Sequence, residues 1–145
     1  MQIEKLYVAQ IQLETAIYLH LDKACYIPSI TLAGAAEEIL GKMLSLDRVA
    51  VTQLSHALIE RYKLEMTSFE LKKNHLNKPR NSLKHNACNE ERSIEIDPEI
   101  ESINMLARAL SNYVSLQLPV TETIKRGVEA VLCYNSAVES HDGNS

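Results

Sequence analysis

Apolar residues recur every three or four positions along almost the whole chain of 145 residues. Because an α-helix turns once in about 3.6 residues, this spacing gathers apolar side chains on one helix face. The clearest apolar stripe covers roughly residues 2 to 22, and a second, capped by Ser29, runs from Ile30 to about Leu44. A third helix is expected to open at Thr52. The pattern predicts an all-α fold.

The second half of the chain shows stronger start and stop signals. Residues 67 to 86 are predicted to form one or two short helices divided near Pro79, and residues 87 to 96 an irregular loop with a short extended tip. Asp97 can cap a long helix, since Pro98 behind it needs no amide partner in a first turn. Pro119 should end that helix.

A last helix is expected to be capped near Thr121. The whole chain then reads as a compact bundle of five to six helices. The bundle forms a single domain over residues 1 to 139, followed by a frayed polar tail over residues 140 to 145.

Composition excludes several classes of protein. With 15 Lys and Arg against 19 Asp and Glu, the net charge is −4, so a globally basic nucleic-acid coat is excluded while a local basic patch is not. No run of eighteen apolar residues exists, so no membrane association is expected. The three cysteines lie far apart and form no Cys-x-x-Cys, and the N-terminus does not suit a secretory signal. These features predict a cytoplasmic protein.

One segment, from Leu71 to Asn89, contains no acidic residue and several basic ones. Within it, Arg80 is followed at once by Asn81, and His85 comes after four intervening residues. Histidine can move a proton near neutral pH, and a guanidinium can hold a phosphate and stabilise extra negative charge. RNA supplies its own nucleophile, the 2′-hydroxyl. The segment therefore carries a candidate metal-independent ribonuclease site.

Helix geometry restricts this hypothesis. Successive residues rotate by about 100°, so Arg80 and His85 point about 140° apart on a straight helix. They converge only if the segment bends, if His85 lies at a helix end, or if a second chain supplies one of the two. The alternative interpretation is a solvated basic face with a chance Arg–His spacing.

A small-residue face on the second expected helix gives a further candidate. Ala33, Gly34, Glu37 and Gly41 fall on one side, where close packing against another helix, including one of a second subunit, would explain the glycines. A carboxylate in such a groove needs a partner, and Arg80 or a lysine is the natural one. Glu37 could therefore orient Arg80, or it could lie exposed at the helix rim.

Several stretches together resemble one known family. They are Gln12 to Ala16, Ser29 to Gly41, Arg80 to His85, Ile96 to Glu99, Met105 to Ala109 and Asn112-Tyr113. Over roughly residues 3 to 125 the chain is similar to an uncharacterised bacterial branch of the HEPN domains (higher eukaryotes and prokaryotes nucleotide-binding). These are compact helical bundles defined largely by an Arg-x4-6-His motif.

The resemblance implies roles for particular residues. Arg80 and His85 would match the family's catalytic pair, and Asn81 the polar residue that commonly follows the arginine. HEPN proteins are often toxins or phage-defence ribonucleases that act as homodimers, with the motif-bearing faces meeting at one cleft. An antitoxin or nucleotidyltransferase partner would fit this picture. Other relatives only bind nucleotides, RNA or partner proteins.

Four further residues of the basic segment are candidates for contacts with RNA phosphates: Lys73, Asn77, Lys78 and Lys84. No cofactor is expected. A mixed metal shell from His75, His85 and Cys88 with Glu37 or Asp97 is conceivable, but no His-x3-His or Glu-x-x-His pair supports it. No metal is therefore predicted.

Three functions compete at this point. The first is a dimeric endoribonuclease with His85 as general acid and base and Arg80 as phosphate clamp. The second is a module that holds a nucleotide or RNA in the same cleft without cutting it. The third is a structural or protein-interaction role, in which Arg80 only stabilises the fold.

Overall fold

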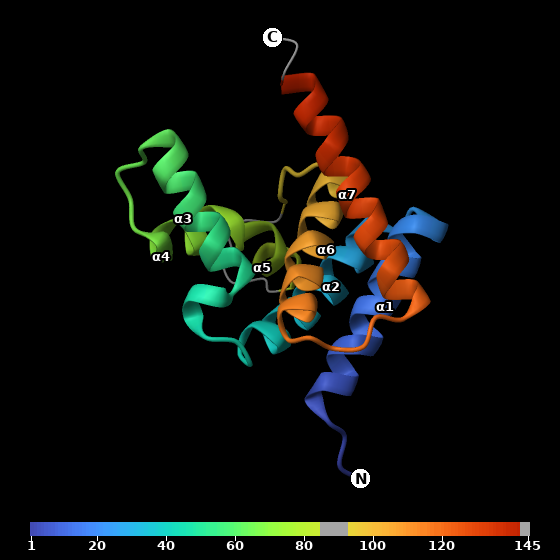
Figure 1. Cartoon of the computed structure of the whole chain (residues 1–145). Coiled ribbons are helices and arrows are strands. Elements are labelled where there is room, and N and C mark those ends of the chain that lie inside the picture. The colour runs from blue at the N-terminus through green and yellow to red at the C-terminus, as the bar shows by residue number, and fades with distance from the viewer. Residues whose placement is uncertain (85–92, 143–145) are drawn as a thin grey trace.

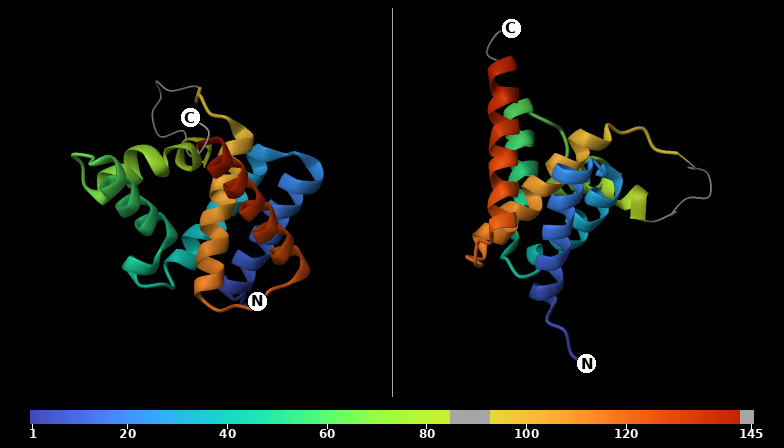
Figure 2. Two further views of the ribbon diagram at one scale, coloured as in Figure 1. Left: turned by 45° about the horizontal axis from the view of Figure 1, so that its top comes forward. Right: turned by 90° about the vertical axis from the view of Figure 1, so that its right-hand side faces the viewer.

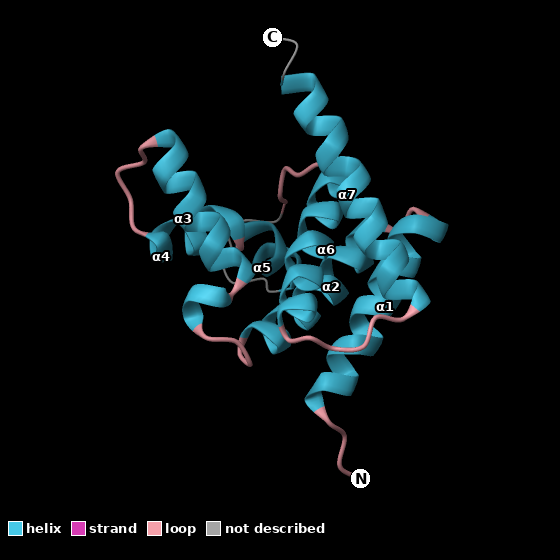
Figure 3. Cartoon of the chain, viewed as in Figure 1, coloured by secondary structure: helices cyan, strands magenta, loops and turns pink. Residues whose placement is uncertain are grey.

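The structure, a computed structural model, describes residues 1–84 and 93–142, which fold into helices (Figure 1). No strand occurs among these residues, and Figure 3 shows helices joined by loops throughout the described chain. The all-α prediction is confirmed. The described residues contain seven α-helices, one or two more than expected, because the segment before residue 85 is divided into several short elements.

Four helices form a layered core that contains the apolar cluster of the protein. They are α1 (Lys5–Lys23), α2 (Tyr26–Gly41), α6 (Pro98–Ser115) and α7 (Glu122–Asp142). Fully buried side chains on α1, α2, α6 and α7, such as Leu13, Leu40, Leu106 and Ile124, belong to this cluster. Each large aliphatic side chain buried here contributes about 1.5–3 kcal/mol to folding. We call these four helices the helical core.

Residues 42 to 84 form a second region, which we call the arm. It contains the 3-10 turn η1 (Leu46–Arg48) and the helices α3 (Ala50–Tyr62), α4 (Ser68–Leu71) and α5 (Lys78–Lys84), with the π-helical segment η2 (Lys72–Leu76) between the last two. Figures 1 and 2 show the arm beside the helical core, with α3 separated from α1 and α7. None of the arm's residues belongs to the apolar cluster of the core.

Two of the three expected helix caps, Asp97 and Thr121, are present in the structure. Asp97 caps α6 as expected, since its Oδ1 accepts the amides of Glu99 and Ile100 at 3.1 and 3.2 Å. Thr121 likewise caps α7 by accepting the Ile124 amide at 3.2 Å. Ser29, in contrast, is no cap. It lies inside α2, which begins at Tyr26, and its hydroxyl donates to the Ala16 carbonyl at 2.9 Å.

The remaining boundaries differ by a few residues. Helix α3 begins at Ala50, so the predicted start at Thr52 falls within its first turn, and α6 ends at Ser115, before Pro119. Helix α7 continues to Asp142, whereas a frayed tail was expected from residue 140. Most of the loop expected over residues 87 to 96 lies outside the described residues, and its described part, residues 93 to 96, has no regular secondary structure.

In the described part of the chain, no helix combines the length and the apolar character needed to cross a bilayer.

Candidate functional site

Glu37 stands at the centre of a buried ionic cluster between the helical core and the arm. This residue of α2 is only 3% exposed, and its Oε2 lies 2.7 Å from Nη1 of Arg80 on α5. Its other oxygen, Oε1, lies 3.1 Å from Nη2 of Arg108 on α6. The predicted contact between Glu37 and Arg80 is therefore present, and exposure of Glu37 at a helix rim is wrong. We call Glu37, Arg80 and Arg108 the arginine–glutamate cluster.

Gly34 is explained by the path of the Arg80 side chain. A Cβ atom at position 34 would lie 2.5 Å from Cδ and 2.7 Å from Cγ of Arg80, which is too close for any real contact. Glycine lets the arginine stem cross α2 and reach Glu37 one turn further along the helix. The small-residue face of α2 is thus covered here by the chain's own arm, and the expectation that Gly34 packs against a second subunit is wrong.

Arg108 is the main site residue that the sequence interpretation missed. Besides Glu37, it binds the arm, because Nη1 donates to the Leu76 carbonyl at 3.0 Å and Nη2 donates to Asn77 Oδ1 at 2.6 Å. Burial lowers the pKa of Arg108 by desolvating its charge, and Glu37 opposes that shift. Its Nε has no hydrogen-bond acceptor in the described structure.

The π-helical segment explains how the arm reaches Arg108. The Asn77 amide donates to the Lys72 carbonyl at 2.8 Å, five residues earlier, so this turn is wider than an α-helical one. Segments of this type occur often at functional sites. At the end of this one, the Leu76 carbonyl and the Asn77 side chain are both available to Arg108.

The two arginines also orient two asparagines. Arg80 Nε donates to Asn81 Oδ1 at 3.2 Å, just as Arg108 donates to Asn77 Oδ1. A guanidinium can only donate hydrogen bonds, so each asparagine must direct its oxygen toward its arginine. The amide NH2 groups of Asn77 and Asn81 are consequently directed away from these arginines, as donors for another acceptor.

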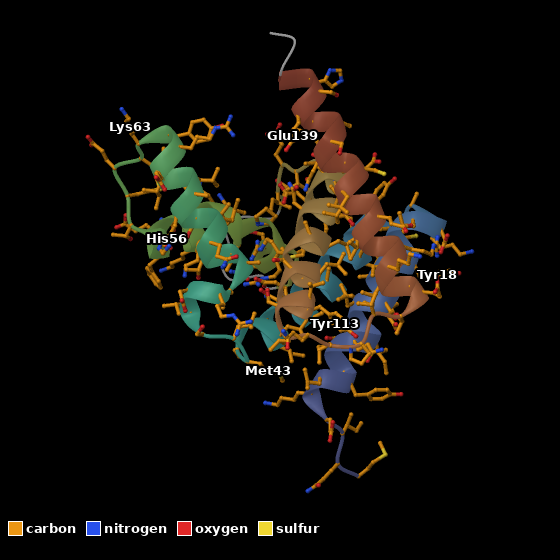
Figure 4. All side chains as sticks on the ribbon, in the orientation of Figure 1. Tyr18, Met43, His56, Lys63, Tyr113 and Glu139 are labelled. Atoms are coloured by element: carbon orange, nitrogen blue, oxygen red, sulfur yellow. The ribbon has the colours of Figure 1, made fainter. Side chains whose placement is uncertain are left out.

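A pocket of about 360 Å³ lies between the end of α2 and the arm. Its wall combines charged, amide and aliphatic groups, namely Glu37, Glu38, Gly41, Lys42, Leu44, Leu46, Val49, Val51, Asn77 and Arg80. In Figure 4, Met43 marks the connection from α2 to the arm beside this region, and His56 lies further along α3. Lys42 is a second pocket cation that the sequence interpretation did not single out.

The sequence-predicted site residues are only partly brought together. Asn77, Arg80 and Glu37 line one pocket, and Asn81 is exposed next to Arg80. Lys73 and Lys78 are exposed on the arm and contribute no lining to the pocket. Lys84 ends α5, but its side chain and the whole of His85 lie outside what the structure describes. The convergence of Arg80 and His85 on one phosphate therefore stays a prediction.

The conceivable metal shell gains no support from the described residues. Within residues 1–84 and 93–142, no three His, Cys, Asp or Glu side chains come together as ligands for a metal ion. Glu37 is engaged by two arginines, and His75 is exposed on the arm. The two remaining candidates, His85 and Cys88, fall outside the described part.

Asn112 anchors the start of α3 next to the pocket. From α6, its Nδ2 donates to the Glu37 backbone carbonyl at 3.2 Å and its Oδ1 accepts the Ala50 amide at 2.9 Å. The side chain is fully buried. A buried amide with both ends paired stabilises this junction, whereas losing one partner would cost about 1–3 kcal/mol. Asn112 therefore fixes the spacing between α2 and the wall formed by Val49 and Val51.

Comparisons with protein-family models, with curated proteins and with solved structures give no match for this chain.

Proposed function

We propose that the chain is a HEPN-like, metal-independent endoribonuclease in which Arg80 holds the scissile phosphate and His85 transfers the proton. The observation that carries the proposal is the position of the Arg80 guanidinium, which Glu37 and Asn81 orient at the wall of the pocket. A guanidinium fixed in advance loses little orientational freedom when it binds a phosphate oxygen.

The proposed reaction uses the 2′-hydroxyl of the RNA. His85 removes the hydroxyl proton, the 2′-oxygen forms a bond to phosphorus, and the bond from phosphorus to the 5′-oxygen breaks. The leaving 5′-oxygen takes up the proton that His85 has removed, so the products are a 2′,3′-cyclic phosphate and a 5′-hydroxyl end. DNA lacks the nucleophile and should resist. Following the family resemblance, we further propose a homodimer joined through the motif-bearing face, acting in the cytoplasm as a toxin or defence effector.

The decisive experiment measures cleavage of single-stranded RNA in excess chelator, with DNA of the same sequence as substrate control. We expect His85→Ala to lower the rate by about 10²- to 10⁴-fold. His75→Ala, which removes an exposed histidine of the same segment, is the matched control and should keep the wild-type rate. Melting temperatures are recorded for every variant.

Arg80 needs a gentler substitution because it is buried. Arg80→Lys keeps the charge but loses the planar fork that serves Glu37 and Asn81 together. We expect a large loss of rate in a protein that still folds. Absence of cleavage by the wild type, or equal cleavage by His85→Ala, would refute the ribonuclease.

A second candidate is binding of a nucleotide or RNA without cleavage. It is favoured by the burial of Arg80, which is only 8% exposed and is tied to Glu37. Such a cation can hold one phosphate, but it has little freedom to move with the phosphate as its geometry changes during cleavage. Thermal stabilisation by nucleotides in the absence of cleavage would select this candidate, since a ligand that binds only the folded chain raises its melting temperature.

A further inference from the structure

The pocket beside Arg80 is lined by two chemically different kinds of group. Arg80, Lys42 and the amide of Asn77 supply hydrogen-bond donors. The start of the arm supplies aliphatic side chains, namely Leu44, Leu46, Val49 and Val51. A ligand that fits both kinds of group is anionic at one end and flat or apolar at the other.

The size of the pocket is compatible with a small ligand. Small-molecule sites usually measure about 300–1,000 Å³, so about 360 Å³ is at the lower end of the range. One nucleotide unit suits this space, whereas a longer stretch of RNA would extend out of it.

The charge of the lining points the same way. Among the described lining residues, Lys42 and Arg80 are balanced by Glu37 and Glu38, so the formal charge of this set is zero. These residues by themselves do not concentrate a polyanion through their electric field, because attraction of that kind needs an excess of positive charge. The pocket would select a single phosphate by placed donors, together with a group that prefers the aliphatic wall.

From these features we infer that the pocket is a subsite for one nucleotide of RNA, with the nucleobase against the aliphatic wall and the phosphate on Arg80. Asn77 donates from its NH2 group to an acceptor atom of that nucleotide, because Arg108 holds its oxygen. The inference rests on the proposed function, since it takes RNA as the ligand and Arg80 as the phosphate clamp.

The test compares inorganic phosphate with the four nucleoside 3′-monophosphates by isothermal titration calorimetry. We expect at least one nucleotide to bind about tenfold or more tightly than phosphate, because only the nucleotide reaches the aliphatic wall. Leu46→Ala removes part of this wall, and Leu46 is 71% exposed, so folding should persist.

Leu46→Ala should weaken nucleotide binding about fivefold and leave phosphate binding unchanged. Leu54→Ala is the matched control, since Leu54 is an exposed leucine of α3 that does not line the pocket. Equal nucleotide affinity in both variants, or a nucleotide that binds no tighter than phosphate, would overturn the inference.

Asn77→Asp tests the orientation of the amide. The new carboxylate still accepts from Arg108 but cannot donate, so nucleotide affinity should fall by more than about tenfold at an unchanged melting temperature. Asn74→Asp adds the same charge to an exposed position of the same segment and should have little effect. Equal losses in the two variants would attribute the effect to charge alone and would overturn the role of the amide.

The results also separate the subsite from the ribonuclease. Cleavage that depends on His85 in a protein whose nucleotide binding ignores Leu46 would leave the ribonuclease intact and refute the subsite. Nucleotide binding that depends on Leu46, in a protein that does not cleave RNA, would support the subsite and refute the ribonuclease. If neither phosphate nor nucleotide binds, both the subsite and the clamp role of Arg80 are wrong.

Discussion

The forces that stabilise the helical core differ from those that attach the arm to it. In the core, apolar side chains from α1, α2, α6 and α7 pack against one another. Polar groups join the arm to this core, including the Arg80–Glu37 ion pair, the Arg108–Leu76 hydrogen bond and the Asn112–Ala50 hydrogen bond. Figure 4 illustrates the separation, with Tyr113 inside the core and Lys63 at the outer end of α3.

The difference shows why the candidate site lies where it does. Apolar attraction is non-directional, whereas a charged group and its partner need a defined distance and direction. These polar contacts therefore position the arm at a few defined points, and the arm also buries Leu44, Ala50, Val51 and Leu71. On α3, in contrast, Leu54 and Tyr62 are exposed.

The largest effect is expected from Glu37→Gln. Removing this charge leaves two buried guanidinium groups without their carboxylate, and breaking a buried pair in this way costs about 3–5 kcal/mol. Chemical denaturation measures the loss. Hydrogen exchange should show faster exchange in α3–α5 than in α1 and α6, because the arm loses its anchor first. Asp22→Asn, in the exposed Asp22–Arg126 ion pair, is the control. Equal effects of the two variants would contradict the distinction.

A core truncation should give a different pattern. Leu106 is 1% exposed within the apolar cluster, and Leu106→Ala should cost about 2–5 kcal/mol of unfolding free energy. Unlike the loss of Glu37, this change should raise hydrogen exchange in the core as much as in the arm. Exchange increased only in the arm would show that the two regions do not differ as proposed.

Gly34→Ala should have an intermediate effect. The new methyl group would displace the stem of Arg80, at a cost of about 1–3 kcal/mol typical of overpacking. RNA cleavage should decline with it, since the guanidinium loses its position. Gly41→Ala is the matched control for stability, because its methyl group would lie 3.4 Å from its nearest neighbours. Unchanged stability and cleavage in Gly34→Ala would show that the arginine does not need this crossing.

The smallest expected effect is a pH dependence of stability that arises from His20 in the helical core. His20 Nδ1 lies 2.7 Å from Ser102 Oγ, and burial lowers the His20 pKa below 6.5, with Glu99 opposing. The unfolded chain therefore binds the proton at higher pH than the folded chain. Stability should be complete above pH 6.5 and decrease as the pH falls below it. Denaturation of His20→Gln between pH 5 and 8 should lack this slope, whereas His56→Gln should keep it.

The sequence predicts the fold class and one site contact correctly, for definable reasons. Helical spacing needs only local information, and Asp97-Pro98 signals a helix start within three residues. The contact between Glu37 and Arg80 follows from a carboxylate placed among small residues. Such a group needs a nearby cation when it is buried.

The sequence does not identify Arg108 as a site residue, because α6 is buried on more than one side. Its apolar stripe is evident, but Met105, Arg108 and Asn112 form a second buried face, spaced three and four apart. The second buried face could have been recognised from two polar residues at this spacing, Arg108 and Asn112, on a helix that begins with a strong N-cap. The π-helical turn, in contrast, left no local signature, since it depends on tertiary contacts of Lys72, Leu76 and Asn77.

The single carboxylate of Glu37 is divided between one guanidinium from the arm and one from the core. Any phosphate that draws Arg80 toward itself competes with this carboxylate and leaves it more fully to Arg108. Ligand affinity and the docking of residues 42 to 84 onto the core are then thermodynamically coupled. Arg108 is not among the residues that line the pocket, yet a substitution at Arg108 should alter binding inside it.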